Sequence, residues 1–287
     1  MADLDPAAGR TPVHTKWQRT SAAWYLIGFL AIYLVAVCTP WGQRAENSLF
    51  GGEGSRPAWI HEWSGAYGTT GPVLPPLGAT ATPALIAGLV ALVVVTLVRR
   101  CWWQGCAAIG TAVATVGATE VFSKLLLPRP DLVNAHVALT AASFPSGHVA
   151  VPAGLVLGAA FVASPRIRPF VTAAGMVWIG VTAAAVQALY HHRPSDVLGA
   201  TVLACAFHLL AARLLPAAGP DSARHPRALP VAAFALSAAG ALAAGARTDS
   251  AAESLVFATS AFGCGVLAWS ATATGNVRRR VRAPRAS

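Results

Sequence analysis

The chain has 287 residues, of which 55% are hydrophobic and only 11% charged, and its mean hydropathy is +0.55. Soluble globular domains carry about 25% charged residues, so this composition excludes a soluble fold and indicates a polytopic membrane protein. A net charge of +10 would suggest a nucleic-acid partner in a soluble protein. Here the basic residues lie in short loops between apolar runs, as membrane topology requires, and we expect no nucleic-acid partner.

Runs of about 20 apolar residues predict an all-α fold with eight transmembrane helices. The runs lie at about 22–38, 80–98, 105–125, 149–164, 169–189, 196–215, 229–246 and 254–273. We therefore expect a cytoplasmic segment over 1–21, a membrane-embedded core over 22–215, two further helices within 216–273 and a basic cytoplasmic tail over 274–287. The five cysteines show no CxxC pair or metal-ligand spacing, so we interpret them as apolar filler.

The distribution of Lys and Arg predicts the orientation. Fifteen of the 21 basic residues fall on one side of the eight spans, which the positive-inside rule assigns to the cytoplasm together with both termini. The outward segments are then 39–79, 126–148, 190–195 and 247–253. Because the chain is rich in Arg and Ala, we expect a bacterial protein of the plasma membrane.

The first outward segment with chemistry is "SKLLLPRPDL", residues 123–132. Lys124 lies in the last turn of a span, Pro128 ends that helix, and Arg129 follows, so two cations project near one helix end. Two interpretations stay open for them: cations that hold an anion, or side chains that anchor the helix at the interface. Glu120, one turn before Lys124, is either functional or the partner that neutralises Lys124.

The second segment is "FPSGHVA", residues 144–150. Pro145 and Gly147 suit a tight turn, and Ser146 stands where a helix N-cap would. The free N–H groups of a helix start bind anions, and His148 opens the next span at that point. The alternative is a capping turn with an incidental interfacial histidine.

The third segment is "ALYHHRPSDVLGA", residues 188–200. His192 and Asp196 are four residues apart, so they can face each other on a helical turn. A carboxylate on one imidazole nitrogen fixes the tautomer and leaves the other nitrogen free to attack. His191 competes with His192 but lies five residues from Asp196, and a purely structural His–Asp pair is the other alternative.

The three segments lie at span ends on one predicted face of the membrane. Two histidines, one carboxylate, cations and an anion-binding turn suit phosphoryl transfer through a phosphohistidine, with one histidine attacking and the other protonating the leaving group. The sequence contains no carboxylate cluster for Mg²⁺, so we expect chemistry without a metal or any other cofactor.

In this order the motifs resemble the three signatures of the type 2 phosphatidic acid phosphatase superfamily. They are Lys124…Arg129-Pro130, Pro145-Ser146-Gly147-His148 and His192-x-x-x-Asp196. The resemblance, over about residues 80–215, implies a six-helix core with an extracytoplasmic site. It implies His192 as nucleophile, His148 as general acid and Asp196 as the residue that orients His192. Lys124, Arg129, Ser146 and Gly147 would bind the phosphate.

Two departures from the family pattern are present. Four residues, in place of six, separate Lys124 from Arg129-Pro130, and Ala185 and Val186 stand where the third motif has Ser-Arg. Three explanations stay open for the missing phosphate-binding arginine: Arg193 replaces it, Gln187 replaces it, or the protein binds a head group of different charge.

The predicted function is a phosphatase acting on a lipid mono- or diphosphate, with polyprenyl (undecaprenyl) diphosphate of cell-wall synthesis as the first substrate candidate. Phosphatidate, phosphatidylglycerol phosphate and a polyprenyl-phosphate sugar phosphate stay open. So do a phosphotransferase with the same intermediate and a non-catalytic lipid-binding module. The loop 56–67, with apolar residues at near-helical spacing, is predicted to lie in the outer interface, as a lid or as a plain interfacial helix.

Overall fold

The computed structural model describes residues 21–50, 55–67, 82–136, 139–140, 142–215 and 228–281. Within these ranges the chain forms helices and no strand. The α-helices are α2 Ser21–Ile32, α3 Pro40–Asn47, α4 Trp59–Gly65, α5 Pro83–Arg99, α6 Trp102–Val121, α7 Gly147–Val162, α8 Arg168–Ala188, α9 Pro194–Leu214, α10 Ala228–Gly245 and α11 Ala251–Val281. The π-helical turns η1 Tyr33–Val37 and η3 Phe122–Leu126 extend α2 and α6, and the 3₁₀ turn η2 Ser48–Phe50 follows α3. The all-α prediction is confirmed. The predicted cytoplasmic segment and the end of the basic tail lie outside the described residues.

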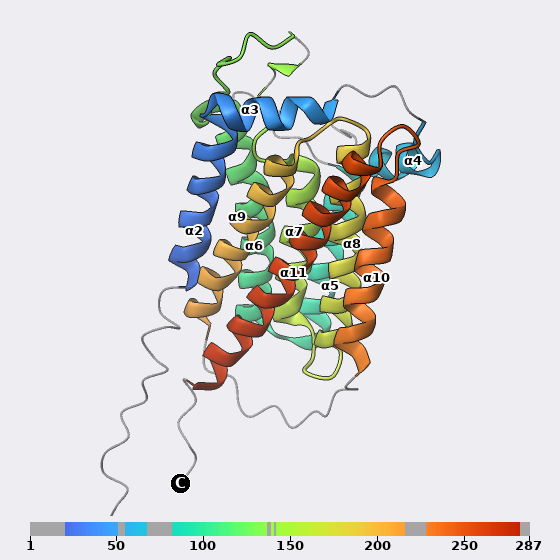
Figure 1. Cartoon of the computed structure of the whole chain (residues 1–287). Coiled ribbons are helices and arrows are strands. Elements are labelled where there is room, and N and C mark those ends of the chain that lie inside the picture. The colour runs from blue at the N-terminus through green and yellow to red at the C-terminus, as the bar shows by residue number, and fades with distance from the viewer. Residues whose placement is uncertain are drawn as a thin grey trace, which may run out of the picture.

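Each of the eight predicted spans forms a helix, and the eight run alternately up and down a bundle (Figure 1). Among the described residues, five helices are long and apolar enough to cross a membrane, and α2 with α3 makes a sixth if that bent pair is counted as one span. α5 and α7 are shorter apolar helices, of 17 and 16 residues. The chain is a multi-pass membrane protein.

α7 lies inside the bundle, because nearly all of its residues are buried. Its approach to α6 depends on glycine: a Cβ on Gly158 would lie 2.6 Å from the carbonyl oxygen of Ala108. Small residues at helix interfaces let backbones approach this closely in membranes. α7 therefore forms the axis around which the other helices are arranged.

α10 and α11 share this core. Ala241 and Ala244 of α10 and Phe257 and Ala261 of α11 are buried in one cluster with residues of α7, α8 and α9. The two helices that were predicted as an addition to the core are packed into it.

Two short helices cover one end of the bundle. α3 lies across this end, bent by 78° from α2 (Figure 1). α4 contains the predicted interfacial helix, and it is attached to α8 through Trp63 and Tyr67, whose side chains hydrogen-bond Thr182 Oγ1 at 3.1 and 2.9 Å. Ile60 is fully buried, whereas Trp59 and Trp63 stay partly exposed. The described parts of three connections, 127–136 with 142–146, 189–193 and 246–250, lie at this same end, so the three motif segments come together there.

Candidate functional site

Two histidines meet at the covered end of the bundle. His148 lies in the first turn of α7 and His192 in the loop before α9, and Nδ1 of His148 is 3.0 Å from Nε2 of His192. Nδ1 of His192 is 3.5 Å from Oδ2 of Asp196 in the first turn of α9. The order His148–His192–Asp196 leaves Nε2 of His192 as the nitrogen that faces the other histidine. His191 does not take this place, since it is His192 that pairs with Asp196.

Asp196 joins the second and third motif segments. Its carboxylate is fully buried and accepts hydrogen bonds at Oδ2 from Ser143 Oγ at 2.6 Å and from the Arg193 backbone N–H at 3.0 Å. Its carbonyl oxygen accepts the Ser146 N–H at 3.0 Å. Three hydrogen bonds therefore fix Asp196, which in turn positions His192 next to His148.

The start of α7 has the predicted anion-binding form. Ser146 is the N-cap, and its Oγ accepts the Val149 N–H at 3.4 Å. The first N–H groups of a helix have no partner within it and carry the positive end of the helix dipole. These groups, at Gly147 and His148, are next to the paired histidines.

A cavity of about 240 Å³, here called the histidine pocket, opens at this point. Its lining includes His148, His192, Gly147, Ser143, Ser123, Glu120, Thr82, Tyr67 and Val151. Its polar groups are the two imidazoles, hydroxyl groups and one carboxylate. It is therefore suited to a small polar group next to both imidazoles.

Lys124 is paired with Glu120 across one turn of α6 and η3. Glu120 Oε1 also faces the helix start, since a Cβ on Gly147 would lie 3.6 Å from it. Of the two open readings for Glu120, the structure supports the carboxylate that neutralises Lys124, and it places that carboxylate in the pocket wall. The Lys124 side chain stays half exposed.

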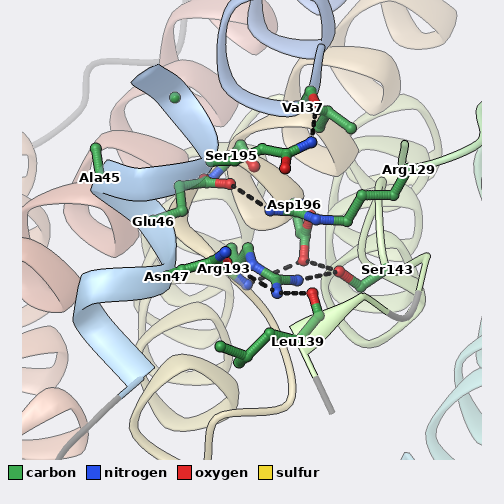
Figure 2. A network of polar contacts seen from close by, with 12 residues as sticks. Val37, Ala45, Glu46, Asn47, Arg129, Leu139, Ser143, Arg193, Ser195 and Asp196 are labelled. Carbon is green, nitrogen blue, oxygen red and sulfur yellow. Dashed lines mark hydrogen bonds and ion pairs between the residues drawn. The ribbon is translucent and has the colours of Figure 1, made fainter. Parts of the chain in front are cut away.

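Of the five predicted phosphate ligands, Gly147 lines the pocket, whereas Lys124, Ser146, Arg129 and Arg193 are absent from its lining. The Arg193 guanidinium lies beside Asp196 and donates to Ser143 Oγ at 3.2 Å, to Asn47 Oδ1 at 3.3 Å and to the Leu139 carbonyl at 2.6 Å (Figure 2).

Arg129 is buried 3.7 Å from Oε2 of Glu46 (Figure 2). Arg129 thus pairs with a carboxylate, whereas Arg193 is held by two side-chain oxygens and a carbonyl, because a buried arginine requires a charged or polar partner. That either arginine contacts the phosphate stays a prediction.

Gln187, the other candidate to replace the missing arginine, also points elsewhere. It is fully buried. Its Nε2 donates to the Ala183 and Phe257 carbonyls, and its Oε1 accepts a hydrogen bond from Ser260 Oγ. Ala185 and Val186 are buried in the core. The described part of the pocket wall thus contains no arginine in the place of the missing one.

Glu46 and Ser143 are site residues that the sequence did not reveal. Glu46 Oε1 accepts the Ser195 N–H at 3.0 Å, and burial, followed by the nearby Asp196 carboxylate, raises the pKa of Glu46. No spacing signal connects residue 46 with residue 195, so sequence reasoning had no means of finding it. Ser143 lies beside the second motif, and its closeness to that motif was a signal that could have been used.

Residues 101–220 match the family model described as the PAP2 superfamily. This segment of the chain is similar to that superfamily. It contains α6 to α9 and so all three motif segments. No curated protein and no solved structure matches the chain. PAP2 proteins are in general phosphatases of phosphate esters, often lipid phosphates.

Within the described ranges, no group of three or more His, Cys, Asp or Glu side chains is placed to hold a metal ion. The groups next to the pocket are those of proton transfer and nitrogen nucleophilic attack.

Proposed function

We propose that the protein is a membrane phosphatase that hydrolyses a lipid mono- or diphosphate through a phosphohistidine, without a metal. The observation that supports this best is the series His148–His192–Asp196 next to the free N–H groups at the start of α7. A nucleophile, an oriented base and an anion-binding helix start are the parts that such a reaction needs.

In the proposed reaction, Nε2 of His192 attacks phosphorus. An N–P bond forms as the bond from phosphorus to the leaving oxygen breaks, and His148 donates a proton to that oxygen. Water then attacks phosphorus, His148 takes a proton from it, and the N–P bond breaks to release inorganic phosphate. Asp196 holds the Nδ1–H of His192 and stabilises the positive charge that the ring gains.

The phosphate oxygens in this proposal face the N–H groups of Gly147 and His148, with Lys124 nearby and Ser146 capping the helix. Arg129 pairs with the carboxylate of Glu46, and Arg193 donates to Ser143, which in turn donates to Asp196. The first substrate candidate is undecaprenyl diphosphate at the extracytoplasmic face, since the charge distribution assigns the covered end of the bundle to that side.

The test is phosphate release by the detergent-purified protein from undecaprenyl diphosphate, phosphatidate and phosphatidylglycerol phosphate in parallel, with EDTA present. We expect release from at least one lipid, and loss of at least three orders of magnitude in His192→Ala, as is typical when a nucleophile is removed. Release that EDTA abolishes, or that the variant retains, contradicts the proposal.

A further inference from the structure

A second cavity, larger and almost wholly apolar, lies between α5, α7 and α8, and is here called the apolar groove. It encloses about 760 Å³, and its lining includes Gly88, Val95, Leu155, Ala159, Gly175 and Trp178. At the end away from the histidines it is bounded by Arg99, whose guanidinium donates to the Val162 carbonyl.

The apolar groove and the histidine pocket follow the same two helices. α5 supplies Thr82 to the pocket and Gly88 to the groove. α7 supplies Val151 to the pocket and, one turn further on, Leu155 to the groove. Because one helical turn rises about 5.4 Å, the two cavities lie in series along the contact of α5 with α7.

The region between them is narrow and made of side chains. A Cβ on Gly88 would lie 2.3 Å from Cδ1 of Leu155, so the leucine packs directly on the backbone of α5. On the α8 side, Nε1 of Trp178 in the groove donates to the hydroxyl of Tyr67 in the pocket at 2.6 Å. Leu155 and the Trp178–Tyr67 pair therefore separate the two cavities.

Resting on the proposed function, we propose that the apolar groove binds the hydrocarbon chain of the lipid whose phosphate occupies the histidine pocket. Its lining is almost free of polar atoms, as a hydrocarbon chain requires and a head group does not. The residues of α7 and its C-cap that line it, from Leu155 to Ala163, span about 12 Å at 1.5 Å per residue. A single groove beside the pocket accommodates one hydrocarbon chain, so it suits a lipid phosphate with one long chain.

Filling the groove tests this assignment. Ala91 of α5 and Ala174 of α8 line two of its walls and are exposed there, so tryptophan fits at either position and occupies the groove. The measurement is the ratio of kcat/KM for undecaprenyl diphosphate to that for geranyl diphosphate, which has the same head group on a short chain. We expect Ala91→Trp and Ala174→Trp to lower this ratio about tenfold, the effect of losing contacts to about ten chain carbons.

The matched control is Ala235→Trp, on an exposed position of α10 outside the groove, which should keep the wild-type ratio. If either groove variant fails to fold, as judged by gel filtration and melting temperature, Ala159→Phe on α7 replaces it. Folded groove variants with the wild-type ratio would show that bulk lipid fills the groove, and the inference falls. If the wild-type protein hydrolyses neither diphosphate, the proposed function is overturned, and so is the assignment of the apolar groove to the hydrocarbon chain.

Discussion

At the scale of single residues, Ser143 occupies the centre of the network behind the histidines. Its hydroxyl donates to Asp196 and accepts from Arg193, so it lies between the charged groups that determine the position of His192. A hydrogen bond to a buried carboxylate contributes about 1.5–3 kcal/mol. The orientation of His192, the proposed nucleophile, thus depends in part on the uncharged side chain of Ser143.

We expect Ser143→Ala to lower kcat about tenfold or more, because Asp196 loses its shortest hydrogen bond and holds His192 less firmly. Ser143→Thr, which keeps the hydroxyl, should recover most of the activity. The control is Ser48→Ala, an exposed serine that bonds the Ala45 carbonyl. Equal kcat for the Ala and Thr variants at position 143 would show that the hydroxyl has no part in orientation.

At the scale of elements, α3 fixes the loops at the covered end. Gln43 Nε2 donates to the carbonyls of Val37 and Pro130 at 2.7 and 2.6 Å, and its Oε1 accepts the Leu132 N–H at 3.2 Å. Glu46 holds the N-terminus of α9 through Ser195. A helix of eight residues thus connects the loop after α6 with the helix that carries Asp196.

Glu46 makes stability depend on pH. Burial raises its pKa above the unfolded value of 4.5, so between these two values the folded state binds more protons than the unfolded state. The contribution of Glu46 to stability is then complete below the unfolded pKa and is lost as the pH rises through the folded pKa. We expect the melting temperature of the wild type relative to that of Glu46→Gln to fall with rising pH. A difference that stays constant from pH 4 to pH 8 would contradict the shift.

The connection between α10 and α11 holds the loop 189–193, here called the histidine loop, which carries His192. Arg247 pairs with Asp249 at 2.8 Å and Glu253 at 3.1 Å, and its guanidinium lies 4.3 Å from the centre of the Tyr190 ring. Arg247 Nη1 also donates to the Ala188 carbonyl at 3.4 Å. The residues that precede His192 are therefore held by a segment outside the one that matches the PAP2 superfamily.

We expect Arg247→Ala to destabilise the protein by about 2 kcal/mol, because it removes a buried guanidinium that pairs with Asp249 and Glu253, and to lower kcat as the loop loosens. Thermal unfolding and phosphate release measure the two effects. Arg213→Ala, near the end of α9, is the control. A variant that loses stability but keeps the wild-type kcat would confine Arg247 to a structural role.

At the scale of the whole molecule, the sequence predicted what depends on composition and local order. The eight helices follow from apolar runs near span length, and the three motifs met because span ends alternate between membrane faces. α3 is short and polar, so its sequence has no apolar periodicity from which a helix could be predicted. The sequence did not predict the partners of the Arg129 and Arg193 side chains. Those partners depend on tertiary contacts, which the spacing of residues along the chain does not encode.

The predicted orientation can be tested on cells. In a variant without the five native cysteines, a single cysteine at Ser250, between α10 and α11, should react with a membrane-impermeant maleimide added from outside. A cysteine at Ser164, between α7 and α8, should react only after the membrane is opened. The reverse pattern would place the histidine pocket on the cytoplasmic side.

The support that Arg247 gives to the histidine loop has a consequence for biosynthesis. A membrane protein inserts its helices from the N-terminus onwards, so α7, α8 and α9 are in place while α11 is still on the ribosome. The histidine loop and the residue before it gain their contacts to Arg247 and Glu253 only when α11 has been inserted. A nascent chain that stalls before this point would carry both histidines and yet lack a finished site, which couples the onset of activity to completion of the bundle.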